Sequence, residues 1–367
     1  MNDAVVIGGG PAGLAVSREL TVRSVDHVVV ERGETVGESW ANAYDSLRLH
    51  TGRHLSGLPG RRIPPSAPLF VPAAEFLAYL RDYASDLRLP IRTRCEAGRV
   101  TRDGERWIVE TSQGALVARA LVVATGIMSS PVVPDFEGRA GFAGSVRHSV
   151  EYRRPGPYVG RRVLVVGAGN SAGEIAPELA EAGADVTVAI RSGASVVPRT
   201  VLGVPIQYVA WAVLQLPVAA RPAIVGAFAR ATRLIRGTPP FPRAEGPLLG
   251  EVPIIGFKLV DAIRAGRIRL RGGLERFTPM GVRFADGVEE PFDDVILATG
   301  FRASLGPIEA LVTRDERGFA RRRDRVVSSE QPDLYFVGHH YDGTGGLYNI
   351  SRDAPAAARL IAEGRRR

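Results

Sequence analysis

Residues 5–13 read Val5-Val6-Ile7-Gly8-Gly9-Gly10-Pro11-Ala12-Gly13, and residues 163–172 repeat the theme as Val163-Leu164-Val165-Val166-Gly167-Ala168-Gly169-Asn170-Ser171-Ala172. Each stretch is a short β-branched run, a glycine turn and the start of a helical pattern. The first glycine of such a turn permits a tight bend, the second lets the backbone approach a pyrophosphate, and the third small residue lets helix and strand pack closely. Two copies in one chain predict two bound dinucleotides and a redox reaction between them.

The residue after the second strand of each copy distinguishes the two dinucleotides. Glu31 follows the strand Val28–Val30, whereas Arg191 follows the strand expected over residues 185–190. An acid at this place accepts hydrogen bonds from both ribose hydroxyls and repels a 2′-phosphate, which suits FAD or NAD. An arginine can instead clamp a 2′-phosphate through a charge-assisted pair, which indicates NADPH for the second copy.

Both copies close on the same tripeptide, since residues 121–126 read Leu-Val-Val-Ala-Thr-Gly and residues 295–300 read Val-Ile-Leu-Ala-Thr-Gly. Helices are expected near 11–22 and 171–182, and hairpins around residues 112–114 and 286–287. Residues 115–118 and 121–126 are each expected to form a strand piece. This pattern predicts an α/β chain of two doubly wound, Rossmann-like dinucleotide-binding domains. A further buried strand at 333–338 and a final helix near 352–363 are assigned back to the first domain. The expected domains are therefore 1–154 with 301–367, which is discontinuous, and 155–300, divided at the turn-rich stretch 154–157.

Composition narrows the possible functions. The chain has 367 residues, of which 45% are hydrophobic, enough for two cores. Its net charge of +8 comes almost entirely from scattered arginines, so we expect no nucleic-acid partner. The lone Cys95 excludes an intramolecular disulfide, a Cys-x-x-Cys redox pair and a cysteine-built metal site, and no metal is expected. Because Val5 begins a strand without a preceding signal-peptide pattern, we expect a cytoplasmic protein.

Residues 201–220 contain no charged side chain, but Gly203, Pro205 and Pro217 interrupt the run. We therefore expect buried or interfacial helices and no integral membrane span, with loose contact to a membrane surface as the alternative. The wider segment 200–250 reads as an apolar helical insertion in the second domain. It could roof a substrate channel or form an oligomer contact, in a homodimer for example, and the sequence does not decide between these.

Further stretches between and after the two copies carry a family resemblance. They are Gly37-Glu38-Ser39-Trp40 followed by residues 44–51, Phe142-x-Gly144-x-x-x-His148-x-x-x-Tyr152, and Leu297-Ala298-Thr299-Gly300-Phe301. This set resembles class B flavin-dependent monooxygenases, whose fingerprint is Phe-x-Gly-x-x-x-His followed by an aromatic residue. It is most similar to the compact plant YUCCA-type branch and its bacterial relatives. The resemblance implies that NADPH reduces bound FAD, that a flavin C4a-(hydro)peroxide forms with O2, and that a small organic substrate takes one oxygen atom.

The resemblance also implies which residues bind the cofactors. Chemistry centred on the flavin leaves only Trp40 and His148 as candidate catalytic side chains. The residues expected at FAD are Gly8, Gly10, Pro11, Ala12, Gly13, Glu31, Arg32, Glu38, Ser39, Trp40, His50, Thr51, Ala124, Thr125, Gly126, Gly338, Gly346 and Leu347. Those expected at NADPH are Gly167, Gly169, Asn170, Ser171, Ala172, Arg191, Ser192, Arg199, Ala298, Thr299 and Gly300.

Two departures from the family pattern affect these assignments. His339 follows Gly338 where many FAD proteins carry an acid, and Gly52 follows Thr51 where animal-type members carry an asparagine. The expected substrate is an amine or sulfur nucleophile or a 2-oxo acid of the indole-pyruvate type. A Baeyer–Villiger oxygenase is less favoured, because such enzymes usually end the fingerprint with tryptophan and this chain has Tyr152. An NADPH-dependent flavoprotein reductase that passes electrons to another acceptor is the second alternative.

Overall fold

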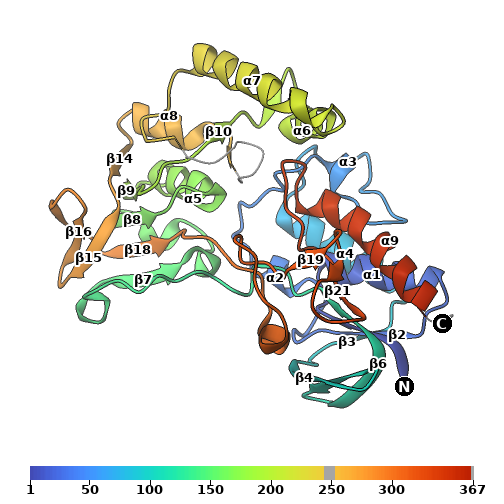
Figure 1. Cartoon of the computed structure of the whole chain (residues 1–367). Coiled ribbons are helices and arrows are strands. Elements are labelled where there is room, and N and C mark those ends of the chain that lie inside the picture. The colour runs from blue at the N-terminus through green and yellow to red at the C-terminus, as the bar shows by residue number, and fades with distance from the viewer. Residues whose placement is uncertain (244–252, 365–367) are drawn as a thin grey trace. The chain divides into compact units, whose positions relative to one another are not determined.

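A computed structural model describes residues 1–243 and 253–364 of the chain (Figure 1). The chain divides into two units, each an α/β fold. Unit 1 comprises Met1–Ser130 and Phe301–Arg367, and unit 2 comprises Pro131–Gly300. The chain thus leaves unit 1, forms unit 2 and returns to unit 1.

The elements of unit 1, in chain order, are β1 (Asn2–Ile7), α1 (Pro11–Val22), β2 (His27–Val30), α2 (Glu38–Ala41), α3 (Arg53–Ser56), α4 (Ala73–Asp86), β3 (Ile91–Arg92), β4 (Ala97–Asp103), β5 (Arg106–Thr111), β6 (Gly114–Val123), the 3₁₀ turn η5 (Gly306–Leu311), β19 (Arg322–Arg323), β20 (Val327–Ser328), β21 (Leu334–Phe336) and α9 (Gly346–Gly364).

The sheet of unit 1 is mixed. Its parallel part has the order β21-β6-β1-β2-β3, and β4, β5, β19 and β20 join it through antiparallel pairs. Because strand side chains alternate between the two faces, Val6 and Val122 pack with the helices on one face, whereas Val5 and Leu121 pack on the other. Helices α1 and α9 lie side by side on the first face (Figure 1). The parallel strands are thus buried on both faces, as their near-continuous apolar runs predict.

The elements of unit 2 are η1 (Arg139–Gly141), β7 (Ser145–His148), η2 (Ser149–Glu151), η3 (Gly156–Tyr158), β8 (Arg162–Val166), α5 (Asn170–Glu181), β9 (Asp185–Ala189), β10 (Val196–Val197), β11 (Thr200–Val201), β12 (Val204–Pro205), α6 (Ile206–Leu214), η4 (Val218–Ala220), α7 (Arg221–Arg236), β13 (Ile254–Ile255), α8 (Lys258–Arg264), β14 (Ile268–Arg271), β15 (Leu274–Thr278), β16 (Gly281–Phe284), β17 (Glu289–Pro291) and β18 (Asp294–Leu297).

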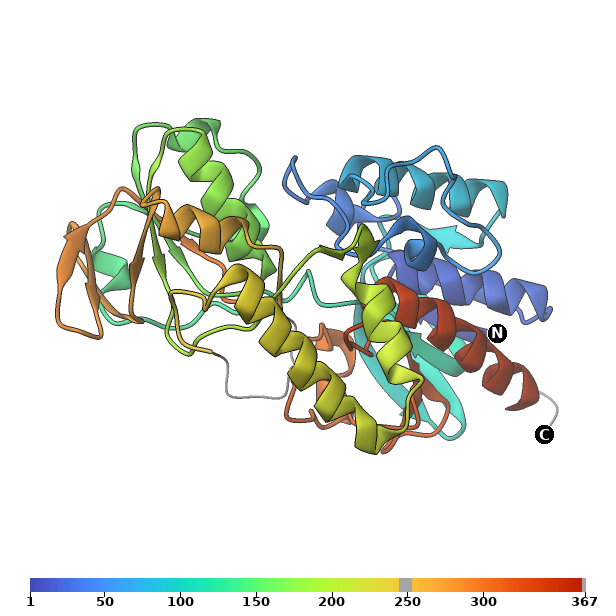
Figure 2. The same cartoon turned by 90° about the horizontal axis from the view of Figure 1, so that it is seen from above.

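The main sheet of unit 2 is parallel, with the order β14-β9-β8-β18-β7. Helices α5 and α8 pack against each other beside this sheet (Figure 2). The small antiparallel sheet β15-β16-β17 supplies Phe277 and Phe284 to a core that also contains Leu164 and Leu297 from the main sheet. Unit 2 therefore repeats the strand–turn–helix–strand plan of unit 1 around its own core.

Most of the expected elements are confirmed. The helices expected near 11–22 and 171–182 are α1 and α5, and both hairpins form, as β5–β6 and β16–β17. The strand pieces expected at 115–118 and 121–126 are one strand, β6, because Arg119 and Ala120 continue it. The final helix begins at Gly346, earlier than the expected residue 352.

The boundary between the two units differs from the expected one. Unit 2 begins at Pro131 and not near residue 154, because β7 pairs with β18 and so joins residues 145–148 to the second sheet. The insertion expected at 200–250 contains α6 and α7, while its part from residue 244 onward lies outside the described residues. Within the described ranges, no helix combines the length and the apolar character needed to cross a membrane.

Candidate functional site

The predicted FAD residues of unit 1 converge on the edge where its parallel strands end. The Gly8 amide donates to the Val30 carbonyl at 2.9 Å, the Ala124 amide to the Ile7 carbonyl at 2.9 Å, and the Val337 amide to the Val123 carbonyl at 3.1 Å. These bonds bring together the turns after β1, β2, β6 and β21. The edge where parallel strands reach their carboxyl ends is the usual ligand site of open α/β sheets.

The first glycine turn leaves room above a helix start. Gly8 has φ +110°, and a Cβ on Gly13 would lie 1.8 Å from the Gly8 carbonyl oxygen, so both positions require glycine. A Cβ on Gly10 would meet nothing within 4 Å. Helix α1 begins at Pro11 with no side-chain cap and no acid in its first turn. Its first N–H groups therefore face open space at the positive helix end, an arrangement that suits a phosphate.

Glu31 is built into this turn. Its carboxylate accepts hydrogen bonds from the Gly9 amide at 2.6 Å and from the Gly33 amide at 2.7 Å, and the residue is 9% exposed. Each carboxylate oxygen has two acceptor positions, so each retains one for a ligand hydroxyl. The acid thus stabilises the protein and remains able to accept hydrogen bonds from a ribose.

The residues expected along the flavin occupy neighbouring loops of unit 1. Helix α2 starts after Gly37, whose amide donates to the Gly9 carbonyl at 3.0 Å. Trp40 in this helix is half-buried and packs edge to face on Phe76 at 4.7 Å between ring centroids. Thr51 is buried, and a Cβ on Gly345 would lie 2.4 Å from its methyl group. Among the remaining expected residues, Arg32 and Ser39 are exposed, and Glu38 and His50 are half-buried.

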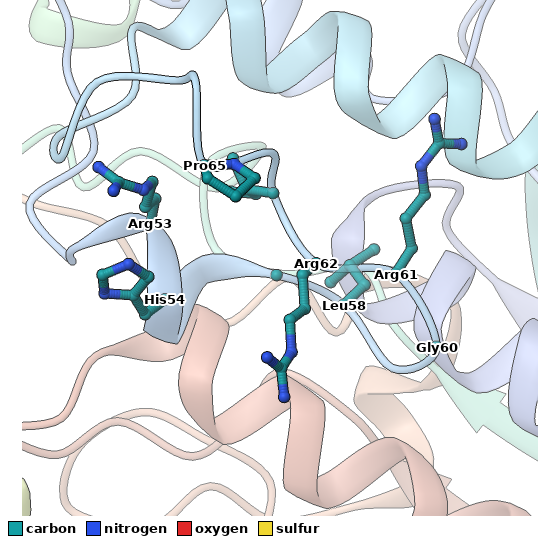
Figure 3. Close-up of a pocket in the computed structure, with 9 residues that line it drawn as sticks. Arg53, His54, Leu58, Gly60, Arg61, Arg62 and Pro65 are labelled. Carbon is teal, nitrogen blue, oxygen red and sulfur yellow. The ribbon is translucent and has the colours of Figure 1, made fainter.

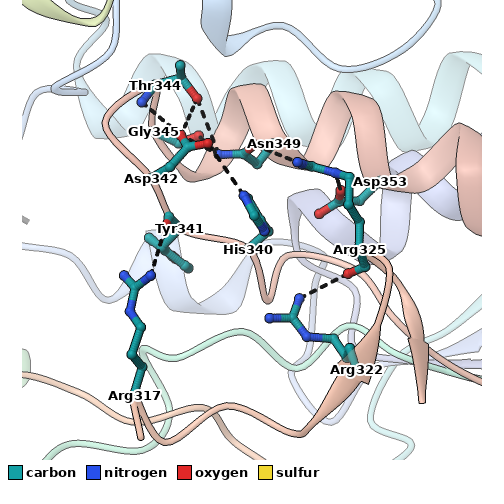
Figure 4. Close-up of polar contacts among 10 residues, drawn as sticks. All are labelled: Arg317, Arg322, Arg325, His340, Tyr341, Asp342, Thr344, Gly345, Asn349 and Asp353. Carbon is teal, nitrogen blue, oxygen red and sulfur yellow. Dashed lines mark hydrogen bonds and ion pairs between the residues drawn. The ribbon is translucent and has the colours of Figure 1, made fainter. Parts of the chain in front are cut away.

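A polar network fixes the loop that leads into α9 (Figure 4). Asp342 accepts hydrogen bonds from Thr344 and from the Asn349 amide group at 2.9 Å. Burial opposes its charge, but hydrogen bonds from His340, Thr344 and Asn349 hold the pKa of Asp342 below its ordinary value. Arg325 bonds Asn349 from the other side at 2.8 Å. The network therefore holds the start of α9, including Gly346 and Leu347, in one conformation.

His339, which occupies the place of the expected acid, is a buried residue of this core. It is 1% exposed and packs against Phe319 and Phe336 at ring distances of 5.8 and 5.2 Å. Neither ring nitrogen has a hydrogen-bond partner among the described residues. Burial, with a smaller contribution from the charges of Arg322 and Arg314, lowers its pKa to about 3, so the ring is neutral.

The turn in unit 2 has the same construction. The Gly167 amide donates to the Ala189 carbonyl at 3.0 Å, and the Ala298 amide to the Val166 carbonyl at 2.8 Å, so the turns after β8, β9 and β18 meet at one edge. Gly167 has φ +130°, and a Cβ on Gly169 would meet nothing within 4 Å. Helix α5 also begins with no side-chain cap and no acid in its first turn. This edge, like that of unit 1, suits a phosphate.

The polar residues around the second turn differ in whether their side chains bond to the rest of the described chain. The Asn170 side chain donates to the Pro253 carbonyl at 3.1 Å and accepts from the Ile255 amide at 2.8 Å, so it ties α5 to β13. Arg199 lies 4.0 Å from Glu174. Arg191 is exposed, and its guanidinium has no hydrogen bond or ion pair with the rest of the described chain. Arg191 is therefore the cation at this edge that is available to a ligand.

Two residues of the Phe-x-Gly-x-x-x-His fingerprint region, His148 and Tyr152, form hydrogen bonds within unit 2. The His148 Nδ1 atom accepts from the Val150 amide at 3.2 Å, and its Nε2–H donates to the Gly300 carbonyl at 3.1 Å. Burial lowers the His148 pKa, although the Gly300 bond and Glu151 oppose this, so the ring is neutral. The Tyr152 hydroxyl donates to Glu178 in α5 at 2.9 Å. Both ring nitrogens of His148 are thus engaged with backbone groups.

The sequence reasoning missed a cavity in unit 1, of about 890 Å³, that lies in the segment after Thr51 (Figure 3). Its walls include Arg53, Arg61 and Arg62. One signal could have revealed it, because the sequence has no acidic residue between Asp45 and Glu75 but several cations. Charge patterning of this kind marks an anion-binding surface as well as a solvated one.

Comparisons with known proteins identify the family. A family model described as pyridine nucleotide-disulphide oxidoreductase matches residues 5–202. Indole-3-pyruvate monooxygenase YUCCA1 of Oryza sativa subsp. japonica is 36% identical over 82% of this chain and 77% of its own length. The chain is a class B flavin-dependent monooxygenase. A second relative, probable indole-3-pyruvate monooxygenase YUCCA7 of Arabidopsis thaliana, is 32% identical over 99% of this chain and 88% of its own length.

A solved structure agrees with this assignment. The flavin-containing monooxygenase from Stenotrophomonas maltophilia is 26% identical and superposes with a TM-score of 0.78, covering 99% of this chain and 98% of that one. The cofactors of the present chain, as a flavin-dependent monooxygenase, are FAD and NADPH. Each of the two open helix starts described above fits the pyrophosphate of such a dinucleotide.

Proposed function

We propose that the monooxygenase holds FAD at the sheet edge of unit 1 and NADPH at that of unit 2, each unit being a Rossmann-like domain. The open helix starts at Gly10 and Gly169 support both assignments, because neither turn offers its N–H groups a side-chain cap. Glu31 accepts hydrogen bonds from the adenosine ribose in unit 1, and Arg191 pairs with the 2′-phosphate in unit 2. The contrast between these two side chains is the observation that carries the assignment.

The remaining residues of unit 1 position the flavin. When bound, reduced FAD supplies the activation of O2 that no amino-acid side chain provides. Trp40 and Thr51 would hold the ring region, and the partial positive charge at the N-terminus of α9 would favour reduced, anionic flavin. Glu38, Ser39, Ala124, Thr125, Gly126 and Gly338 complete the binding site in this proposal. The Asp342 network holds α9 in place for this role.

His148 acts in this proposal as a positioning residue for the NADPH site. Its Nδ1 accepts a backbone N–H and its Nε2–H is donated to Gly300, so neither nitrogen is free to move a proton. The bond to Gly300 fixes the end of the Ala-Thr-Gly turn at the edge where the nicotinamide cofactor binds. Removal of the imidazole should therefore weaken NADPH binding more than it slows a proton transfer.

We infer that the substrate is a small 2-oxo acid. This inference is supported by the two relatives described above, which are an indole-3-pyruvate monooxygenase and a probable indole-3-pyruvate monooxygenase. Insertion of one oxygen atom beside the keto carbon breaks its bond to the carboxyl carbon. The 2-oxo acid, O2, NADPH and a proton then give the shortened carboxylic acid, CO2, NADP⁺ and water, so that NADPH provides the two electrons that reduce the second oxygen atom.

The test uses the purified holoenzyme with NADPH and ¹⁸O2. Indole-3-pyruvate should yield indole-3-acetate with one labelled oxygen and equimolar CO2, while amine and thioether comparison compounds should remain unlabelled. Labelled N-oxide or sulfoxide would contradict the 2-oxo acid assignment and keep the monooxygenase. Oxidation of NADPH with an artificial acceptor, without label in any product, would indicate a reductase instead.

A further inference from the structure

The cavity after Thr51 has walls that are already in place. Residues Leu58–Arg61 form a tight turn closed by a bridge between its two ends. The Tyr79 hydroxyl accepts from the Leu58 amide at 2.8 Å and donates to the Arg61 carbonyl at 2.6 Å. The Tyr83 hydroxyl donates to the Pro59 carbonyl at 2.7 Å. Helix α4 thus fixes the turn through two tyrosines, so a ligand would bind without first ordering this loop.

The charged side chains that line the cavity carry positive charge. Of the described residues that line it, none carries a carboxylate. Arg61 is committed elsewhere, through an ion pair with Asp86 at 2.6 Å. Arg53 and Arg62 also line the cavity, and neither guanidinium is bonded to any other described residue. Arg53 and Arg62 are therefore each available to an anionic ligand, and their guanidinium groups point in different directions (Figure 3).

Arg53 provides the observation that points most directly to a ligand. Its Nε atom is buried from solvent and has no hydrogen-bond partner among the described residues. A buried donor without an acceptor is destabilising, and more so when it is charged. A carboxylate in the cavity would remove this penalty, because guanidinium and carboxylate match in shape and can form paired hydrogen bonds.

The cavity also lies beside the proposed flavin position. Arg53 begins α3 two residues after Thr51, and the Thr51 methyl group packs against Gly345, immediately before α9. The Thr51 hydroxyl bonds Ser56 at the other end of α3 at 2.6 Å. Apolar lining comes from Leu58 and Ile63, which are buried. The site thus combines two cations with an apolar wall, as a small aromatic or aliphatic acid requires.

We propose that this cavity is the carboxylate subsite of the substrate, in which Arg53 binds the acid group, Arg62 adds positive charge, and Leu58 and Ile63 contact the organic body. The inference rests on the proposed function, since it specifies which part of the chain selects a 2-oxo acid over a neutral ketone. The volume of about 890 Å³ falls in the range of small-molecule sites. Selection then depends on residues that belong to neither glycine turn.

The experiment measures binding of two probes to the oxidised holoenzyme by calorimetry. Indole-3-acetate carries a carboxylate and indole-3-acetamide is its neutral counterpart. The double variant Arg53→Gln/Arg62→Gln should raise the Kd of indole-3-acetate by roughly 10- to 100-fold, as expected for a lost charge-assisted pair, and leave that of indole-3-acetamide unchanged. Arg53→Lys, which keeps the charge but loses the paired geometry, should give an intermediate loss.

Controls separate the subsite from the fold and from the proposed reaction. Arg99→Gln removes an exposed arginine of β4 from the same unit and should change neither Kd. Flavin content and Tm report whether the double variant is folded. Equal affinity of the wild type for the two probes, or an unchanged KM for a 2-oxo acid in the double variant, would overturn the subsite. Arginine-dependent binding of indole-3-acetate without turnover of any 2-oxo acid would instead overturn only the proposed substrate.

Discussion

The two glycine turns share a backbone and differ in the residue that comes after the second strand. In unit 1 the carboxylate of Glu31 is bonded to Gly9 and Gly33, so it holds the turn together. In unit 2 Arg191 is exposed and bonded to none of the described residues. The acid is thus a structural part of its turn. The Arg191 guanidinium makes no hydrogen bond or ion pair with the described residues, so we expect a change of this group to alter the choice of dinucleotide with little cost in stability.

The third small residue of each turn shows a second difference. Gly13 and Ala172 are each the third residue of their helices, yet only Gly13 is pressed against the first glycine, since a Cβ added to it would lie 1.8 Å from the Gly8 oxygen. Ala172 carries its methyl group in a fully buried position. Glycine is therefore required at the third position of the turn in unit 1, whereas alanine fits there in unit 2.

The largest expected effect comes from Gly13→Ala. The added methyl group must displace α1 from β1, and we expect a loss of about 3 kcal/mol or more in the free energy of unfolding, with loss of flavin. The matched control, Ala172→Gly in α5, should cost about 1–2 kcal/mol, from the helix penalty of glycine and the loss of one buried methyl group. Tm and flavin content check both variants, and a stable, flavin-loaded Gly13→Ala protein would show that the two turns are equivalent.

Glu31→Gln tests whether the acid supports its own turn. One of the two bonded amides would then face an NH2 group, which should cost about 2 kcal/mol and reduce flavin content. Arg191→Gln is the counterpart in unit 2 and should leave chemical denaturation unchanged. If both variants unfold at the same denaturant concentration as the wild type, the proposed structural difference between Glu31 and Arg191 is wrong.

Arg191→Glu tests whether the residue at position 191 selects NADPH over NADH. A negative charge facing the 2′-phosphate should raise the KM for NADPH by roughly 100-fold and leave that for NADH almost unchanged. Stopped-flow reduction of the flavin by each cofactor provides the measurement. An equal loss for both cofactors would exclude Arg191 as the contact to the 2′-phosphate.

Two of the buried histidines, one in each unit, extend the comparison to pH. Both nitrogens of His148 in unit 2 are bonded, whereas those of His339 in unit 1 have no partner among the described residues. Burial lowers the His339 pKa from 6.5 to about 3. The unfolded chain therefore takes up the proton first, so this contribution to stability is complete above pH 6.5 and is lost as pH falls toward 3.

His339→Leu should remove this dependence. Between pH 6.5 and 5 the wild type should lose about 2 kcal/mol of unfolding free energy through this residue, at about 1.4 kcal/mol per pH unit. At pH 8 the ring is neutral in both states, which provides the reference for each protein. Identical slopes of stability against pH in the variant and the wild type would contradict the assignment.

The sequence predicted the features that depend on local pattern. Both turns, both first helices and the contrast of Glu31 with Arg191 follow from glycine spacing and strand length. Features set by distant contacts were missed. The start of α9 at Gly346 depends on the hydrogen bond between Asp342 and Asn349. From the sequence alone, the adjacent glycines Gly345 and Gly346 indicate a loop. The acid-free run between Asp45 and Glu75 indicates an anion-binding surface, but the cavity itself depends on the bonds from Tyr79 to the turn between Arg53 and Arg62.

The return of the chain to unit 1 has a consequence for the order in which the protein is made. Unit 2 is one continuous stretch, complete once Gly300 has left the ribosome. Unit 1 begins earlier but must wait for β21 to pair with β6 and for α9 to cover α1. During that interval an edge of β6 and an apolar helix face lack their partners, and such surfaces promote aggregation. The half of the protein that is synthesised first is therefore the half that finishes folding last.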